Sequence, residues 1–139
     1  MECTVRWSGT GMTFVAETGS KHVLVMDGAA EGGGRDLAPR PMETVLAGTG
    51  GCMNYDVIAI LKKNGQDVTA CDLRLEGDRA TTEPKVFTRI HMQFTVRGRS
   101  LKRNLVEHAI RLSYDKYCSA TAMLKQTAEI TTGFEIEEA

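Results

Sequence analysis

Two of the four cysteines stand at positions where a thiol could do redox chemistry. Cys52 follows Gly50-Gly51 within a stretch of helical pattern, and paired glycines weaken a helix and let another backbone approach closely. If the helix bends there, Cys52 lies near the positive end of the following segment, which favours a thiolate, while Asp56 one turn later opposes it. Cys118 lies where one helical pattern ends and the next begins. These positions suggest a redox pair, with core packing as the alternative.

The remaining candidate residues point to structural roles. Cys3 and Cys71 fall on inward positions of predicted strands, where a free cysteine acts as a small buried hydrophobe. His91 faces outward on a strand, and His108 borders the apolar side of a helix. The sequence has no Cys-x-x-Cys or His-x-x-x-His spacing, so we expect no metal site.

Composition and charge narrow the possible classes of protein. The chain has 139 residues and 15.2 kDa, which predicts a single domain over residues 1–139. Seventeen basic and eighteen acidic residues leave a net charge of −1, so we expect no nucleic-acid partner and no anionic membrane partner. The polar residues between Thr44 and Leu61 do not suit a membrane span. The segment Met1–Ser8 has no apolar core of a signal peptide, and together with four cysteines this predicts a reducing, cytoplasmic location.

The first part of the chain is predicted to form β-structure. Apolar and polar residues alternate in Glu2–Ser8, and two further strands are predicted at Met12–Thr18 and His22–Met26, separated by glycine-containing turns. Strands this close together most simply form an antiparallel meander. The glycine-rich segment Ala29–Pro39 has no periodicity and is predicted to be a loop.

A long helix is predicted next, from Met42 to Lys63, with Pro41 in its first turn. Lys62, Lys63, Asn64 and Gly65 supply the signals of a helix C-terminus. Apolar and small residues surround this helix on all sides, so we expect it to be buried on most of its surface. A chain this small could hardly cover such a helix alone, which favours a dimer.

The rest of the chain is predicted to add three strands and two helices. Ser100 is the expected N-cap of the first of these helices. The resulting order β-β-β-α-β-β-α-α-β describes an α+β fold with a long buried central helix packed against curved antiparallel sheet. The predicted elements are strands Val68–Glu76 and Phe87–Arg97, helices Leu101–Tyr117 and Cys118–Gln126, and strand Ala128–Glu137.

Two segments of the sequence resemble one known family. The run Pro41-Met42-Glu43-Thr44-Val45-Leu46-Ala47-Gly48-Thr49-Gly50-Gly51-Cys52, with Asp56-Val57 behind it, resembles the central helix of the OsmC/Ohr family. That family contains the osmotically inducible and organic hydroperoxide resistance proteins. The run Lys116-Tyr117-Cys118-Ser119-Ala120, leading into Met123-Leu124, resembles the family's second cysteine motif. The similarity is greatest to the YhfA-like branch of the family.

The resemblance implies an OsmC-like fold, an intertwined homodimer and a peroxidase reaction in oxidative-stress defence. Cys52 would attack an organic hydroperoxide and become a sulfenic acid, and Cys118 would resolve it as a disulfide. An external dithiol reductant, for example of lipoyl type, would then reopen the disulfide. The resemblance implies no metal and no bound cofactor.

The residues that would activate Cys52 depart from the family's pattern. An arginine lowers the pKa of the family's reactive cysteine, and a glutamate lies ten residues before that cysteine, where this chain has Met42. Glu43 is displaced from that position by about 100° around the helix. Arg35 and Arg40 are both candidates for the arginine, or else solvated loop charges. This departure keeps open an alternative function: a non-peroxidatic relative that binds a small apolar ligand, or senses redox state, at the dimer interface.

Overall fold

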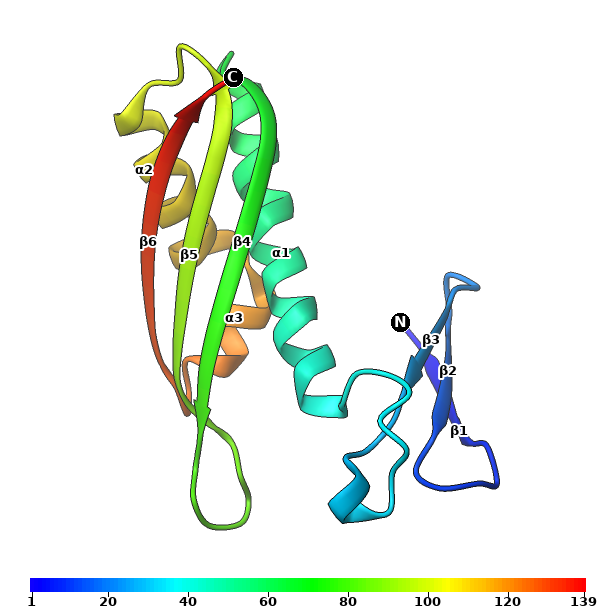
Figure 1. Cartoon of the computed structure of the whole chain (residues 1–139). Helices are drawn as coiled ribbons and strands as arrows, with labels where there is room; N and C mark the ends of the chain where they lie inside the picture. The colour runs from blue at the N-terminus through cyan, green and yellow to red at the C-terminus, as the bar shows by residue number, and fades with distance from the viewer. The chain divides into compact units, whose positions relative to one another are not determined.

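The computed structural model describes all residues from Met1 to Ala139 and contains two compact units, shown in Figure 1. One unit is Met1–Val45 and the other is Leu46–Ala139, so the division falls inside the first turns of the long helix. We describe each unit by itself. The prediction that residues 1–139 fold as a single domain stays a prediction.

The N-terminal unit contains the predicted antiparallel meander. Strands β1 (Cys3–Trp7), β2 (Phe14–Thr18) and β3 (Val23–Met26) are neighbours in that order, and Ala16 pairs with Val5 on one side and Leu24 on the other. Each strand begins within one or two residues of its predicted start. The alternation of apolar and polar residues therefore located all three strands.

The apolar face of this small sheet is exposed along its edge strand β1. Cys3, Val5 and Trp7 lie on the same face of β1, and all three are exposed, with Val5 at 54% and Trp7 at 60%. The prediction that Cys3 is buried is therefore wrong. The period-two pattern places Cys3 on the apolar face correctly, but β1 is an edge strand whose apolar face is not covered within the N-terminal unit.

The loop that follows β3 is held by a buried carboxylate. Asp27 accepts hydrogen bonds at its Oδ1 from the backbone N–H groups of Gly28 (2.7 Å) and Arg35 (3.4 Å). Its Oδ2 accepts from the N–H of Leu37 (3.3 Å) and the hydroxyl of Thr13 (3.2 Å). A short 3-10 helix, η1, spans Ala30–Gly32 inside this loop. A predicted loop without periodicity thus has a defined local structure organised around one side chain.

Helix α1 (Pro41–Lys63) matches its predicted bounds, but only one stripe of it is buried. The buried positions recur every three or four residues, as expected for a helix with one face on a core. The prediction that α1 is buried on most of its surface is therefore not met within one chain. Tyr55, on its outer side, is 77% exposed. An 18-residue window of α1 has a mean hydropathy of 1.2, so the helix is long and apolar enough to cross a membrane by length and composition alone, which is weak evidence for a span. The stripe consists of Thr49, Gly50, Met53, Val57 and Leu61.

The C-terminal unit contains a three-stranded sheet in the order β4-β5-β6, formed by Asp67–Arg79, Phe87–Arg99 and Glu129–Glu138. The pair β4–β5 is antiparallel, whereas β5 and β6 run parallel. The expected all-antiparallel sheet is thus wrong at β6. The helical segment between β5 and β6 carries the chain back along the sheet, so β6 starts at the end where β5 starts.

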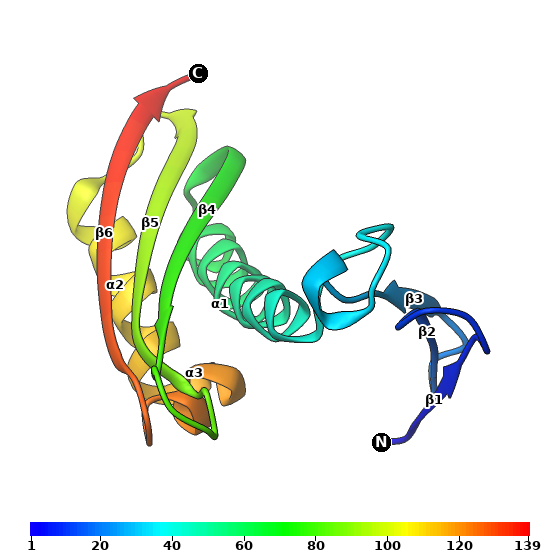
Figure 2. The ribbon, with the colours of Figure 1, turned by 60° about the horizontal axis from the view of Figure 1, so that its bottom comes forward.

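The helices of the C-terminal unit lie on one face of this sheet (Figures 1 and 2). Helix α2 (Arg103–Leu112) continues into a π-helical turn, η2 (Ser113–Tyr117), and the short helix α3 (Ser119–Leu124) follows. The prediction that Ser100 caps α2 is wrong, because Ser100 has a positive φ of 51° and Lys102 is the N-cap. The inward residues of β5 form the core beneath the helices: Ile90, Met92, Phe94 and Val96.

Candidate functional site

Helix α1 crosses strand β4 at close range, and this contact fixes the rotation of the helix. The Asn54 side-chain amide donates a 2.8 Å hydrogen bond to the backbone carbonyl of Cys71 on β4. One turn earlier, a Cβ added to Gly50 would lie 2.7 Å from Cδ1 of Leu75. A Cβ at position 50 would therefore require the end of the Leu75 side chain to move. The rotation that this contact fixes also determines which side of α1 presents Cys52.

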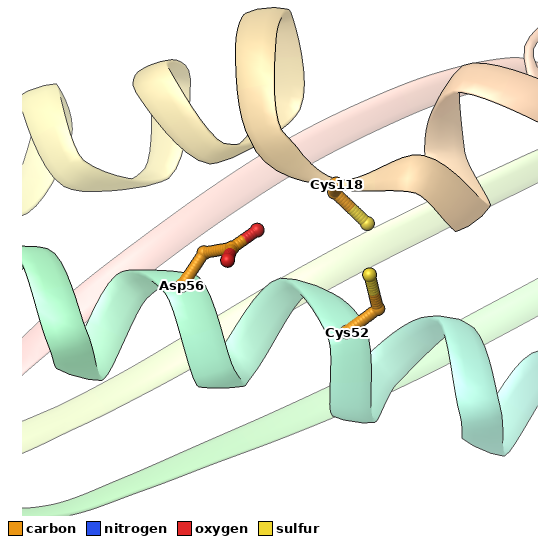
Figure 3. Close-up of side chains that lie close together, drawn as sticks. All are labelled: Cys52, Asp56 and Cys118. Carbon is orange, nitrogen blue, oxygen red and sulfur yellow. The ribbon is translucent and has the colours of Figure 1, made fainter.

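Cys52 and Cys118 lie side by side although 65 residues separate them in the sequence. Cys52 projects from α1, Cys118 stands at the start of α3, and their sulfur atoms point toward each other (Figure 3). Asp56, one turn after Cys52 on the same helix, joins them. The two sulfur atoms and a carboxylate oxygen all lie within 4.8 Å of one another. The structure thus brings together the two cysteines that the sequence singled out.

The two thiols have different surroundings. Cys118 is 2% exposed and Cys52 is half-buried. Cys118 is the N-cap of α3: its sulfur accepts a hydrogen bond from the backbone N–H of Thr121 at 3.5 Å. Burial raises the pKa of the Cys118 thiol, the hydrogen bonds with Thr121 oppose this, and the neighbouring Cys52 raises it further, so the net direction is upward. Cys118 is therefore kept as a protonated, sheltered thiol beside a more accessible one.

Asp56 is oriented by a side chain from the helical segment opposite. The buried Ser113 hydroxyl lies 3.0 Å from Oδ2 of Asp56, to which it donates, and 3.2 Å from the sulfur of Met53. Ser113 is the first residue of η2, and its carbonyl accepts from the backbone N–H of Cys118 at 2.8 Å. One residue therefore links the carboxylate and the second thiol.

A cleft reaches this cluster from the surface of the C-terminal unit. It has a volume of about 460 Å³ and lies between α1 and the α2–η2 segment. Asp56 stands in its wall, whereas neither cysteine lines the cleft. The other lining residues are mostly apolar or uncharged, with one cation: Ala59, Ile60, Lys63, Asn64, Leu112 and Tyr117.

The three residues predicted to activate Cys52 all belong to the N-terminal unit. Arg40 and Glu43 contact each other: the backbone N–H of Arg40 donates to Oε2 of Glu43 at 2.9 Å, and its guanidinium lies 3.3 Å from Oε1. Arg35 donates to the hydroxyl of Thr13 at 3.2 Å. Both arginines are exposed in this chain. An arginine and a glutamate are thus paired at the start of α1, and their action on Cys52 stays a prediction.

Sequence reasoning missed part of the cluster. The sequence places Asp56 one turn from Cys52, where its spacing alone indicates only an opposing charge. Ser113 carried no signal, because a serine within a helical pattern normally faces solvent or the preceding turn. The expectation of no metal site depends on the spacing of ligands along the sequence. That spacing does not show that the fold brings Cys118 close to Cys52 and Asp56 on α1.

The fold and this cluster define a class: small α+β proteins in which a cysteine on a long central helix meets a second cysteine at the start of a later helix. Residues 32–133 match the family described as OsmC-like protein. The chain is also 42% identical over 136 residues to Protein YhfA of Escherichia coli strain K12, covering 98% of each protein. This protein therefore belongs to the OsmC-like family.

Solved structures extend the similarity. A hypothetical protein from Aquifex aeolicus VF5 is 28% identical, with a TM-score of 0.85 over 99% of this chain and 96% of that one. An organic hydroperoxide resistance protein, OsmC of Legionella pneumophila, has a TM-score of 0.70 at 14% identity, covering 96% of this chain and 95% of its own. At that identity the likeness shows a shared fold.

Proposed function

We propose that this protein is a cytoplasmic thiol-dependent peroxidase that reduces organic hydroperoxides in oxidative-stress defence. The observation that carries the proposal is the pair of thiols, Cys52 and Cys118, whose sulfur atoms lie within 4.8 Å of each other on separate elements. The family and the Legionella protein named for organic hydroperoxide resistance support the substrate class. Four cysteines that are all free thiols fit a reducing compartment.

The reaction follows from the different surroundings of the two thiols. The Cys52 thiolate attacks the terminal peroxide oxygen, the O–O bond breaks, and the alkoxide leaves as an alcohol after taking up a proton. Cys52 is then a sulfenic acid. The sulfur of Cys118 attacks it, the disulfide forms, and the Cys118 proton leaves with the hydroxyl group as water. An external dithiol reduces the disulfide by exchange and becomes a disulfide itself.

Burial of Cys118 suits the second of these steps. A sheltered thiol with a raised pKa does not compete with Cys52 for peroxide, since the thiolate is the nucleophile. It is also already in place when the sulfenic acid forms, so the disulfide closes before further peroxide can over-oxidise Cys52. The arginine that would activate Cys52 is Arg40 or Arg35, with Glu43 holding Arg40 in position.

The proposal includes a homodimer. The apolar face of β1 leaves Val5 and Trp7 more than half exposed, and the outer side of α1 exposes Tyr55. Exposed apolar side chains on one face of a strand or helix are typical of an interface. A second copy of the chain would cover them, and it would give the N-terminal unit the apolar burial that its small size otherwise lacks.

Two substitutions test the catalytic proposal. Cys52→Ser should abolish turnover of an organic hydroperoxide, because it removes the nucleophile. Cys118→Ser should still consume one equivalent of peroxide per chain but should not recycle efficiently. Cys3→Ser, which removes an exposed cysteine outside the cluster, is the matched control and should be fully active. Turnover by Cys52→Ser at the wild-type rate would refute the proposal.

The cleft beside Asp56 favours a second candidate function, the binding of a small, mainly apolar ligand without peroxide chemistry. Ile60, Leu112 and Tyr117 provide apolar walls, and the volume of about 460 Å³ suits a small organic molecule. If this is the function, Ile60→Trp should block ligand binding, whereas Cys52→Ser should leave it intact. Ligand binding that survives Ile60→Trp unchanged would exclude this cleft.

A further inference from the structure

The peroxidase proposal leaves one feature of the site unused, the carboxylate of Asp56. This carboxylate lies within 4.8 Å of both sulfur atoms, yet no step of the proposed reaction uses it. None of the ion pairs in the structure involves Asp56, so no basic side chain neutralises it. Its hydrogen-bond donor is the neutral hydroxyl of Ser113. A carboxylate with no role in the proposed reaction is thus held in place beside both thiols.

We propose that Cys52, Asp56 and Cys118 form a binding site for a zinc ion when the thiols are reduced. Two thiolates and one carboxylate are a ligand set that Zn²⁺ accepts, and three protein ligands leave a fourth position for water or an exogenous ligand. A divalent cation would bind three negatively charged ligands and would remove the repulsion among them.

The geometry suits this ion. Zinc–sulfur bonds of about 2.3 Å and zinc–oxygen bonds of about 2.0–2.2 Å place the ligand atoms of a tetrahedral site roughly 3.5–3.8 Å apart. The three atoms already lie within 4.8 Å of one another. Side-chain rotations that move these atoms by about 1 Å would bring them to the spacing of a tetrahedral site. Cys52 and Asp56 are one helical turn apart on the same face of α1, and Cys118 approaches from α3 (Figure 3).

The surroundings of the ligands are those of a supported metal site. Ser113 holds one oxygen of Asp56 at 3.0 Å and leaves the other oxygen free to bind, as donors behind metal-bound carboxylates commonly do. The backbone N–H of Thr121 already points at the sulfur of Cys118. The cleft with Asp56 in its wall provides a path for the ion from solvent.

Metal binding and the disulfide exclude each other, a consequence that rests on the proposed function. Two zinc-bound thiolates give up two electrons and form the Cys52–Cys118 disulfide. The hydroperoxide takes up these electrons with two protons and becomes an alcohol and water, and the zinc ion is released. Zinc would thus hold the reduced pair and compete with peroxide for it.

Cobalt(II) tests the site directly, because thiolate ligands give a sulfur-to-metal charge-transfer band in the near ultraviolet. The reduced, metal-free protein is titrated with Co²⁺, and Zn²⁺ is then added to displace it. We expect one Co²⁺ per chain, a thiolate band that Zn²⁺ abolishes, and the same behaviour in Cys3→Ser. Cys52→Ser should lose about half of the band. Asp56→Asn keeps both sulfurs and the Ser113 contact, so its band should remain while Co²⁺ affinity falls about tenfold or more.

A second measurement needs no substitution. Oxidation of the thiols by diamide before the titration should abolish Co²⁺ binding by the wild type. The site is overturned if wild-type protein shows no thiolate band, if the band survives oxidation, or if Asp56→Asn binds Co²⁺ as tightly as wild type. Peroxide turnover is measured separately. A chain that binds zinc but does not reduce peroxide refutes only the proposed function, and the reverse result refutes only the metal site.

Discussion

At the scale of the residue, position rather than residue type separates the four cysteines. Cys118 is buried and caps a helix, Cys52 lies half-buried beside it, and Cys3 is exposed on an edge strand. Burial, together with the charge of Asp72, raises the pKa of the Cys71 thiol to about 11. Cys71 therefore has very little thiolate at neutral pH and is an internal control for any thiol chemistry at the pair.

The residues of the candidate site could be predicted only in part. Cys52 and Cys118 were recognisable because each stands within a family motif, and Cys118 also marks the end of a helical pattern. The bend considered at Gly50-Gly51 is absent, because α1 runs unbroken from Pro41 to Lys63. Cys3 was placed wrongly, since the alternation that marks an apolar face does not tell whether that face is covered. Ser113 was missed because its role depends on where η2 meets α1, a tertiary contact that leaves no periodic signal.

Asp27 gives a prediction about the pH dependence of stability. Burial alone would raise the pKa of Asp27, but hydrogen bonds from three backbone N–H groups and from the Thr13 hydroxyl outweigh it, so the pKa lies below its ordinary value of 3.8. The ionised carboxylate therefore stabilises the fold above pH 3.8, and this contribution is lost as the pH falls through the lowered pKa. We expect Asp27→Asn to lower the urea midpoint at neutral pH.

The difference between Asp27→Asn and wild type should shrink on acidification, because the wild-type side chain then becomes neutral as well. Asp36→Asn, in the same loop, is the control: Asp36 is exposed and its 3.8 Å ion pair with Arg40 contributes little. The argument fails if Asp27→Asn and Asp36→Asn shift the midpoint equally at neutral pH, or if the effect of Asp27→Asn grows as the pH falls.

At the scale of the element, helix α1 was predictable and the direction of β6 was not. Pro41 and Gly65 mark the two ends of α1 through their own backbone preferences, so local sequence is enough to locate it. The alternation in β6 shows that it is a strand with one inward face. It carries no information on whether that strand runs with or against β5, because the connection through α2 and α3 decides this.

The crossing of α1 over β4 gives a prediction for Gly50, with the neighbouring Gly51 as its control. Gly50→Ala places a Cβ 2.7 Å from Cδ1 of Leu75, whose side chain must move aside. The cost of about 1–3 kcal/mol for overpacking outweighs the gain of about 0.8–1 kcal/mol in helix propensity, so we expect the free energy of unfolding to fall. Gly51→Ala, the next residue, meets nothing within 4 Å and should stabilise the helix by about 0.8–1 kcal/mol. Urea unfolding at one fixed chain concentration compares them. Equal stability of the two variants would contradict this packing.

At the scale of the whole molecule, the proposed dimer explains why apolar side chains remain uncovered in one chain. Val5→Lys puts a charge on the apolar face of β1, and we expect it to raise the dimer dissociation constant at least about tenfold, or ~1.4 kcal/mol. Thr4→Lys adds the same charge on the opposite face of the same strand and should leave the dimer intact. Sedimentation measures the molecular mass of the wild type and of each variant in solution. A wild-type mass equal to one chain of 15.2 kDa would exclude the dimer.

The central claim is that Cys52 and Cys118 form one redox pair, and a thiol count tests it most directly. The reduced protein receives one equivalent of an organic hydroperoxide, its free thiols are counted before and after, and any disulfide is located by mass mapping. We expect a fall from four thiols to two, a Cys52–Cys118 disulfide, and unmodified Cys3 and Cys71. Four unreacted thiols, or a disulfide that involves Cys3 or Cys71, would contradict the account.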